Sequence, residues 1–307
     1  MLSSKKKLIL LKPCGQNSNR LMQNLHFEAF CIEHRIDYRN PTFNNGHLYI
    51  SPCSVKTNSF IKYLSANILE QTFQQSNIIK KIFSFAWLLS KSVFVKYIDF
   101  DRVNIDKDRK KILLKAFEKK NTVYVSGWKF RVSDLIEKNR IELVKRYSLK
   151  PEFYENNNLY KKIIKIKKQE NILIGIHIRR GDYKNWLGGK YYFEDEVYEA
   201  YMKEFLEKLS KETDKNQVFI IFSNDNVKFL ENDNILISKE CWYIDHHLMS
   251  LCDYLIGTHS TFTLWASYIG GNTFFSIRDN SGKIENTVSD FRENDMFHIF
   301  GEKGRCI

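Results

Sequence analysis

The chain has 307 residues, of which 43% are hydrophobic and 27% are charged, with only 13 glycines and 4 prolines. This length and composition exclude collagen-like, low-complexity and wholly disordered proteins, and they allow one large or two medium folded domains. Lysine and arginine total 48 against 36 acidic residues, and the formal net charge of +12 favours an anionic partner such as nucleic acid, an acidic membrane surface or a phosphorylated small molecule.

Neither the N-terminus nor the cysteines indicate export. The start, MLSSKKKLILLKP, has only a four-residue apolar run, too short for a secretory signal, and the apolar stretch 82–89 is too short for a membrane span. The six cysteines are scattered without a CxxC pair, which predicts reduced thiols rather than a disulfide framework. We therefore expect a soluble, cytoplasmic protein.

The first half of the chain begins like an open α/β domain. Residues 7–11 form a short apolar run, the turn-like cluster CGQNSN follows, and apolar residues then recur at helical spacing as far as Ile32. Residues 78–98 mix lysine with large apolar side chains, and we interpret them as a core helix, the alternative being a membrane-surface helix. Residues 122–125 are typical of a strand and residues 132–147 of a helix.

The charged stretch 161–171 marks the expected domain junction, which gives an N-terminal domain of residues 1–160 and a C-terminal domain of residues 161–307. Beyond it, strands are expected at 172–178, 218–222, 235–237, 254–256 and 273–277, and helices at 197–209, near Lys228, at 248–252 and at 261–268. This alternation predicts a parallel sheet flanked by helices, with ligands bound beyond the carboxyl ends of the strands.

The most informative segment is IGIHIRRGDY, residues 174–183. Its apolar strand ends abruptly at Arg179 and Arg180, so two guanidinium groups lie at the sheet edge where the phosphates of a ligand would bind. The planar fork of arginine suits phosphate oxygens, and its charge does not titrate away. The alternatives are a surface arginine pair that closes the strand, and an RGD adhesion motif, which a cytoplasmic location disfavours.

A second informative segment is DYLIGTHSTFTLWASYIGG, residues 253–271. A strand runs into a polar turn, and a helix of apolar and small residues follows, with Ser260 as a natural N-cap. The free N–H groups and positive end of such a helix form an anion site suited to a diphosphate. An ordinary capped helix is the alternative. Together with the arginines that follow the strand 172–178, the start of this helix would enclose an anion between fixed positive charge and a helix N-terminus.

Acidic residues between these two segments are less diagnostic. Asp225, in the sequence FSND, and Asp245 each follow a strand edge, where a carboxylate can accept hydrogen bonds from a base or a ribose. Each is equally consistent with a helix cap or a surface carboxylate. The cysteines and histidines of residues 241–259 match no paired zinc-ligand spacing, so we expect no metal site.

Three elements in this order, HIRRGDY, FSND and LMSLCDYLIGTHSTFTLWASYIG, resemble the α-1,2-fucosyltransferase family and, more distantly, the α-1,6- and protein O-fucosyltransferases. The resemblance covers residues 172–280. It implies an α/β GT-B fold, in which two Rossmann-like domains have a cleft between them. It also implies GDP-β-L-fucose as donor, inversion at the anomeric carbon and no metal or other cofactor.

Carried over by position, the resemblance implies donor-binding residues, namely His177, Arg179, Arg180, Asp225, Asp245, Ser260 and Thr261. The arginines would bind the GDP phosphates, the helix start would meet the diphosphate, and His177 and Asp245 would hold the guanine or nearby groups. Arg179 would also stabilise the leaving group during catalysis. For the chemistry on the acceptor, Asp182 and Glu28 are the candidate carboxylates.

Acceptor-side residues are expected at Asn19, Arg20, Tyr183 and Tyr191. The implied acceptor is an oligosaccharide or a lipid-linked glycan, with peripheral contact to an anionic membrane and no nucleic acid. The turn CGQNSNRLMQN keeps only part of the family's glycine-rich GGLGNQ-type turn. The linkage is therefore open, as is the sugar, because GDP-linked L-galactose or colitose would suit the same site.

Two rival hypotheses come from other classes of protein. A metal-dependent GT-A glycosyltransferase would use Asp99 and Asp101, which follow an apolar run as a metal-holding DxD does, although the arginine strand would then be unexplained. A basic nucleic-acid-binding module would account for the charge of +12, with 23 Phe and 16 Tyr, but no aromatic–basic binding motif is visible.

Overall fold

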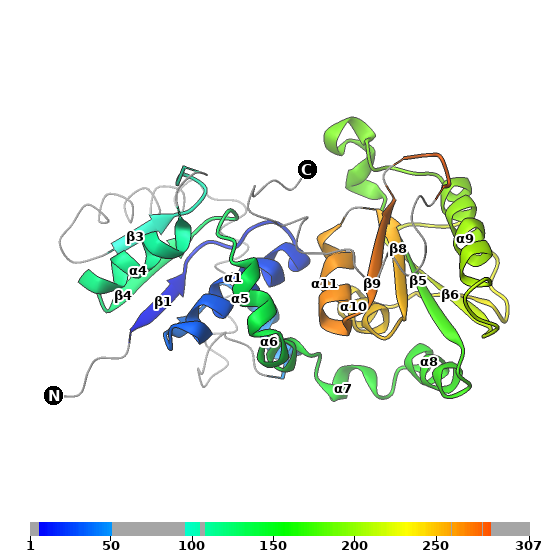
Figure 1. Ribbon diagram of the computed structural model, residues 1–307, viewed down its shortest axis with the longest axis horizontal. Coiled ribbons are helices and arrows are strands. Elements are labelled where there is room, and N and C mark those ends of the chain that lie inside the picture. The colour runs from blue at the N-terminus through cyan, green and yellow to red at the C-terminus, as the bar shows by residue number, and fades with distance from the viewer. Residues whose placement is uncertain (1–5, 51–95, 105–107, 259, 278, 284–307) are drawn as a thin grey trace. The chain divides into compact units, whose positions relative to one another are not determined.

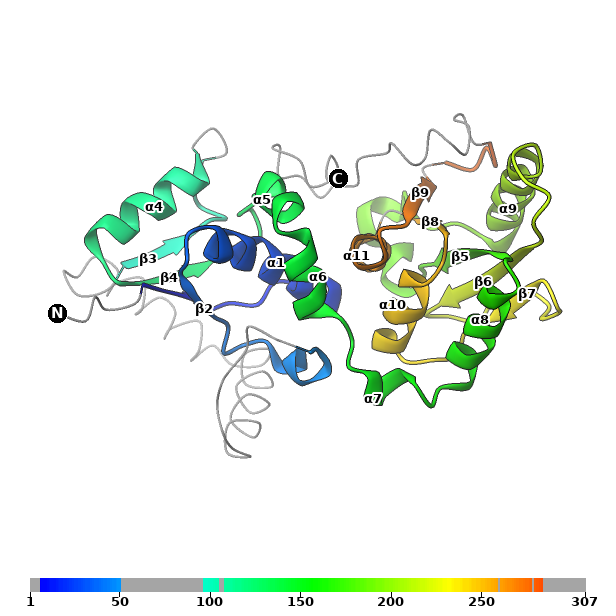
Figure 2. The same cartoon turned by 60° about the horizontal axis from the view of Figure 1, so that its bottom comes forward.

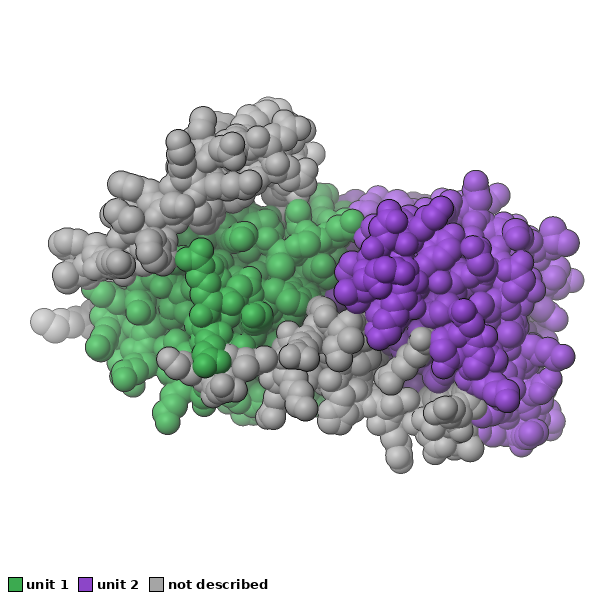
Figure 3. All heavy atoms as spheres, turned by 90° about the horizontal axis from the view of Figure 1, so that it is seen from above, with its two compact units in different colours: residues 1–148, 297–307 green, residues 149–296 purple. Residues whose placement is uncertain are grey.

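A computed structural model describes residues 6–50, 96–104, 108–258, 260–277 and 279–283 (Figure 1). The described chain divides into two α/β units, which Figure 3 colours separately: unit 1 ends at Ser148 and unit 2 begins at Leu149. The expected junction at 161–171 instead lies inside unit 2, because the lysine-rich segment there is a helix that packs on that unit. Among the helices of the described residues, none is long and apolar enough to cross a bilayer.

Unit 1 contains a four-stranded parallel sheet in the order β2-β1-β4-β3. Its strands are β1 (Lys7–Leu10), β2 (Asp37–Arg39), β3 (Lys96–Asp99) and β4 (Thr122–Ser126). The helices among its described residues are α1 (Asn17–Glu33), α4 (Arg109–Lys119), α5 (Ser133–Lys138) and α6 (Arg140–Tyr147), with a 3₁₀ turn at Asn44–Leu48.

The core of unit 1 forms where α1 meets aromatic residues from the loops that follow β3 and β4. Phe27 of α1 stacks on Phe130 with ring centroids 4.5 Å apart, and Phe100 lies 4.7 Å from the same ring. All three rings are buried. Their burial removes a large apolar area from water and fixes α1 on the sheet.

Two expectations for unit 1 were wrong in detail. The predicted helix 132–147 is two helices, because the chain leaves helical geometry at Asn139. The predicted helix 78–98 overlaps β3, which pairs with β4 from Lys96 onward, and residues 78–95 lie outside the described residues. An edge strand rich in polar and aromatic side chains lacks the continuous apolar run that marks a buried strand.

Unit 2 contains a five-stranded parallel sheet in the order β7-β6-β5-β8-β9. The strands are β5 (Ile172–Ile178), β6 (Gln217–Ser223), β7 (Ile235–Ile237), β8 (Tyr254–Thr258) and β9 (Thr273–Ile277). The helices are α7 (Pro151–Tyr154), α8 (Asn158–Lys168), α9 (Asp195–Leu209), α10 (Trp242–Ser250) and α11 (Thr261–Gly270), with 3₁₀ turns η2 (Gly181–Lys184) and η3 (Trp186–Gly189).

The strand order reverses at β5, since β6 and β7 continue on one side of it and β8 and β9 on the other. Helix α9 covers one face of the sheet, and α10 and α11 cover the other (Figures 1 and 2). The isoleucines of β5 at 174, 176 and 178 pack into the core under α9. In a sheet of this kind, ligands bind beyond the carboxyl ends of the strands at the reversal point, which here is the edge of β5 and β8.

Two glycines allow the central strands to pack closely. Gly257 pairs in register with His177, and a Cβ at Gly257 would lie 2.6 Å from the His177 carbonyl oxygen. A Cβ at Gly175 would lie 2.6 Å from a Leu255 methyl carbon.

The short helix expected near Lys228 is absent: residues 226–230 form no helix, because contacts with Arg180 and Asp195 hold this segment.

Candidate functional site

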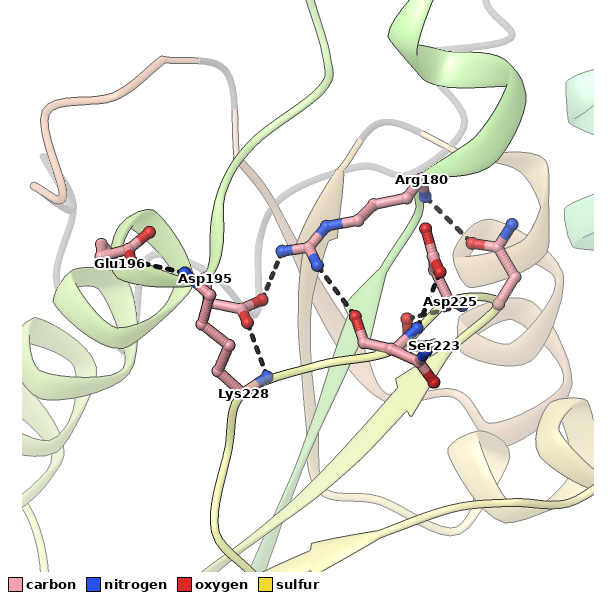
Figure 4. A network of polar contacts seen from close by, with 8 residues as sticks. Arg180, Asp195, Glu196, Ser223, Asp225 and Lys228 are labelled. Atoms are coloured by element: carbon pink, nitrogen blue, oxygen red, sulfur yellow. Dashed lines mark hydrogen bonds and ion pairs between the residues drawn. The ribbon is translucent and has the colours of Figure 1, made fainter.

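Arg180 points into unit 2 and holds a buried polar network (Figure 4). Its guanidinium forms an ion pair with Asp195 at the start of α9, and both side chains are at least 92% buried. Arg180 also donates a hydrogen bond to the Asn226 carbonyl at 3.0 Å, and its backbone N–H donates to the Asn224 side chain at 2.9 Å. The second Asp195 oxygen accepts a bond from the backbone N–H of Lys228 at 2.7 Å.

This network ties β5, α9 and the loop after β6 together. A buried arginine whose charge is balanced by a buried carboxylate stabilises the loop that it contacts, and is not itself free to bind phosphate. The structure thus supports a positioning role for Arg180 rather than the predicted phosphate contact. Asp225 is exposed on the same loop, where its carboxylate accepts a bond from the Asn226 N–H at 2.8 Å.

Arg179 has the opposite environment. Its side chain is 18% exposed and donates to the Asp182 carboxylate at 2.8 Å, and the side chain of Asp182 is 57% exposed. The guanidinium carbon lies 5.5 Å from the centre of the Tyr183 ring. The aromatic ring and the carboxylate hold the guanidinium at the carboxyl end of β5 while leaving it accessible to a ligand.

Helix α11 begins next to this arginine strand, because β8 pairs with β5 and α11 follows β8. Ser260 is the N-cap, and its hydroxyl accepts a hydrogen bond from the Phe262 N–H at 3.2 Å. Thr261 is the first helical residue and is half-buried. The positive end of a ten-residue helix and the Arg179 guanidinium therefore lie at the ends of neighbouring strands, the arrangement expected for an anion site.

His177 is buried beneath the start of α11. Its Nδ1 lies 2.6 Å from the Thr263 hydroxyl, and its ring stacks on Phe262 at 4.9 Å. Burial, and secondarily the charge of Arg179, lower the pKa of His177 to about 3, so the imidazole is neutral. These contacts fix α11 on β5 and support a positioning role for His177 rather than direct contact with a guanine.

Asp245 lies in the first turn of α10, which packs on α11. Its carboxylate accepts a hydrogen bond from the Ser238 hydroxyl. Burial raises the pKa of Asp245 to about 7; the Ser238 bond opposes this rise, and the charge of Glu240 adds to it. A carboxyl group with this pKa changes its charge near neutral pH. A bound ligand that donates hydrogen bonds to the carboxylate would favour the ionised form.

Aromatic side chains form a continuous cluster beyond Arg179. Trp186 lies between Tyr183 and Tyr191, with ring centroids 5.0 and 5.6 Å away. The two tyrosines are more than 90% buried, whereas Trp186 is partly exposed. The next residue, Leu187, has a left-handed backbone with φ of 50° and is 54% exposed. The turn thus presents an apolar, aromatic surface close to the charged end of β5.

Unit 1 carries the other predicted residues. Asn19 and Arg20 lie in the first turn of α1, and Arg20 donates to the carbonyl of Gly15, whose φ is +60°. Glu28 is buried; it accepts bonds from Arg146 at 2.7 Å and from the Tyr147 hydroxyl at 2.6 Å. Because these bonds fasten α6 to α1, the structure supports a structural role for Glu28 rather than that of a general base.

Asp99 and Asp101, the residues of the rival DxD hypothesis, serve the local backbone. Asp99 accepts a bond from the Asp101 N–H at 3.1 Å, and Asp101 accepts bonds from the N–H groups of Trp128 and Lys129 at 2.7 and 3.1 Å. The two carboxylates therefore stabilise the turns after β3 and β4. Within the described parts of the chain, no three His, Cys, Asp or Glu side chains are grouped so as to hold a metal ion.

Sequence reasoning missed four residues of the site: Asp195, Ser238, Thr263 and Trp186. The first three are partners of predicted residues, and each becomes visible only when the fold brings its element alongside. Trp186 had a sequence signal, since it lies between the two predicted tyrosines in the segment YKNWLGGKYY.

Comparison with known proteins gives a consistent result. The sequence profile described as glycosyl transferase family 11 matches residues 96–294. No curated protein matches the chain. Among solved structures, a mutant of FUT1 from Arabidopsis thaliana in complex with GDP has a TM-score of 0.52 at 10% identity, covering 91% of this chain and 72% of that one.

Two further solved structures are similar at lower TM-score. The fucosyltransferase NodZ from Bradyrhizobium has a TM-score of 0.46 at 10% identity, covering 92% of this chain and 98% of that one. POFUT1 in complex with GDP has a TM-score of 0.45 at 12% identity, covering 90% and 97%. The likeness to the FUT1 structure shows the fold of the chain.

Proposed function

Since the chain belongs to glycosyl transferase family 11, it is a fucosyltransferase with the GT-B fold, and we propose that it transfers L-fucose from GDP-β-L-fucose to a glycan hydroxyl. The reaction inverts the anomeric carbon and gives an α-1,2 linkage without a metal ion. The GDP complex of the FUT1 structure supports GDP as the nucleotide. The GT-A alternative is incompatible with this fold.

One observation carries the proposal: Arg179 and the capped start of α11 lie at the adjacent ends of β5 and β8. Cleavage of the bond between the sugar and the phosphate leaves negative charge on GDP. A fixed guanidinium and the positive end of a helix stabilise that charge, a task that a divalent cation performs in other glycosyltransferases.

The roles of the neighbouring residues follow from their contacts. Arg180, Asp195 and His177 position β5, the loop after β6 and α11, so that the two positive groups are held before the donor binds. Asp182 orients Arg179 and is, with its exposed side chain, the remaining candidate base among the predicted carboxylates. In an inverting reaction that base removes the proton of the attacking hydroxyl.

The acceptor is an oligosaccharide or a lipid-linked glycan. The partly exposed ring of Trp186, held between the buried rings of Tyr183 and Tyr191, suits the apolar C–H face of a sugar ring, and Asn19 and Arg20 are the proposed acceptor-side residues of unit 1. The protein acts in the cytoplasm, with peripheral contact to an anionic membrane. L-Galactose and colitose remain the alternative sugars.

The decisive experiment measures hydrolysis and transfer from a panel of GDP- and UDP-sugars, with and without EDTA. We expect GDP-fucose to be consumed in EDTA by the wild type and by Arg102→Ala. This control removes an exposed arginine that is distant from Arg179 in the sequence. We expect Arg179→Ala to lose this activity. Turnover of only a UDP-sugar, or a strict need for Mn²⁺, would overturn the proposal.

A further inference from the structure

Helix α8 presents a row of lysines that the proposed reaction does not use. Lys161, Lys162, Lys165 and Lys168 are all exposed, and none forms an ion pair with a described residue. At 100° per residue, Lys161, Lys165 and Lys168 fall within about 60° of one another, and Lys162 borders them. We define these four residues as the α8 lysine face.

The opposite side of α8 is fixed to unit 2. Ile163 is fully buried, and the Tyr160 ring lies 4.9 Å from Tyr154 and 5.8 Å from His247 of α10. The fifth lysine, Lys167, is turned inward and donates to the Leu251 carbonyl at 2.6 Å. The α8 lysine face is therefore held outward by packing on the other side of the helix.

Helix stability alone does not account for these lysines. Positive charge in the last turn interacts favourably with the helix dipole, which would explain Lys165 and Lys168. Lys161 lies at the end of the first turn and Lys162 in the middle of the helix, where the helix dipole does not favour a positive charge. Like charges three and four residues apart also repel, by about 0.2–0.5 kcal/mol per pair. Glutamates at these spacings would instead form stabilising pairs with the lysines.

We propose that the α8 lysine face is a docking surface for an anionic lipid bilayer. Four ammonium groups on one exposed side of a helix suit a layer of lipid phosphates, and each lysine near such a surface strengthens binding roughly fivefold. The face has no arginine fork and no exposed aromatic ring, the groups that nucleic-acid surfaces use to contact bases and phosphates. Docking would bring unit 2 to the layer where a lipid-linked acceptor resides.

The test is sedimentation of the full chain with vesicles of phosphatidylcholine, with and without phosphatidylglycerol. We expect binding only to the phosphatidylglycerol vesicles, falling at least roughly tenfold when Lys161, Lys162, Lys165 and Lys168 are all changed to Gln. The matched control changes four other exposed lysines of unit 2 to Gln, namely Lys203, Lys211, Lys239 and Lys283. This control has the same net charge as the variant of the α8 lysine face, and it should bind the vesicles like the wild type.

Three results would overturn the proposal: no vesicle binding by the wild type, equal loss in both quadruple variants, or binding to duplex RNA that depends on the α8 lysine face while vesicle binding does not. Hydrolysis of GDP-fucose in solution, without vesicles, should be equal in all three proteins. This readout confirms that the variants are folded, and it separates failure of membrane docking from failure of the proposed reaction.

Discussion

Arg179 and Arg180 are neighbours in the sequence, yet they have opposite surroundings. Arg180 forms a buried ion pair with Asp195, whereas Arg179 forms a partly exposed ion pair with Asp182. Removing one partner of a buried ion pair leaves an uncompensated charge in the interior, while an exposed pair adds little stability. At this position the chain separates two functions of arginine, structural support and ligand binding.

The two alanine variants should therefore differ in kind. We expect Arg180→Ala to lower the free energy of unfolding by about 3–5 kcal/mol, and Arg179→Ala to lower it by less than about 1 kcal/mol. Arg179→Ala should instead weaken GDP binding roughly 10- to 100-fold, the value of a charge-assisted hydrogen bond. Urea unfolding and GDP titration measure the two quantities; a stable Arg180→Ala protein with weak GDP binding would reverse the assignment.

Asp245 gives a pH-dependent prediction. Its pKa, raised to about 7 by burial, exceeds that of an unfolded aspartate, so the folded state holds the proton more tightly. The protonated carboxyl therefore stabilises the folded state. This contribution to the free energy of unfolding is fully present below about pH 4 and is lost as pH rises to about 7, by at most about 1.4 kcal/mol per pH unit.

We therefore expect Asp245→Asn to be more stable than the wild type at about pH 8, and this advantage to shrink towards about pH 4. Urea unfolding of both proteins across this range measures the difference, and the buried histidines, being common to both, cancel. If Asp245 also accepts bonds from guanine, GDP binding by the wild type should strengthen as pH rises through about 7, and this trend should vanish in the variant. A stability difference independent of pH would contradict the first prediction.

Some elements of secondary structure were predictable from the local sequence alone. The strands 172–178, 235–237 and 273–277 have the predicted bounds, because each is an apolar run between polar turns. The break at Asn139 and the extended segment near Lys228 were not predictable. The segment near Lys228 depends on a tertiary contact, the Asp195 bond to the Lys228 N–H, that no local pattern records.

The same limit applies to the site. The arginines after β5 and the N-cap of α11 carry local signals, a charge at the end of an apolar run and a serine before a helix. Strand alternation places the side chains of Arg179 and Arg180 on opposite faces, but no local pattern says which of the two is paired in the interior. That depends on Asp195 of α9. Thr263, the partner of His177, lies 86 residues away along the chain.

Strand spacing at the site gives an element-scale prediction. A Cβ at Gly257 would meet the His177 carbonyl, so Gly257→Ala should force β8 away from β5 and displace the start of α11. We expect a loss of about 1–3 kcal/mol of stability together with weaker GDP binding. Gly188→Ala is the control, since a Cβ there meets no atom within 4 Å and only the left-handed backbone is strained, by about 1–2 kcal/mol. Normal GDP binding by Gly257→Ala would contradict the prediction.

The turn from η2 to η3 gives a second prediction at this scale. Trp186→Ala should raise the KM for the glycan acceptor by up to about tenfold, because an aromatic face is lost, and should leave hydrolysis of GDP-fucose without acceptor unchanged. Trp186→Phe, which keeps an aromatic ring, should restore most of the acceptor affinity. Equal effects on hydrolysis and transfer would mean that Trp186 supports Arg179 through Tyr183 instead of binding the acceptor.

At the scale of the whole molecule, the two units divide the predicted residues unequally. Every donor-binding candidate belongs to unit 2, whereas Asn19, Arg20 and Glu28 belong to unit 1. A ligand that binds the native state adds about 2.7 kcal/mol of stability at a hundredfold excess over its Kd. In hydrogen exchange, this added stability protects the segments that open locally when the ligand is absent.

GDP should therefore slow amide exchange first in segments 178–184 and 254–263, the ends of β5 and β8 with the start of α11. Exchange measured by mass spectrometry, with GDP and with UDP at equal concentration, gives the comparison, and Arg179→Ala provides a protein in which the effect should fade. The segment 96–101 holds Asp99 and Asp101 and serves as the internal reference. Protection of that segment ahead of β5 and β8 would move the nucleotide to unit 1, because a bound ligand stabilises most strongly the backbone that it contacts.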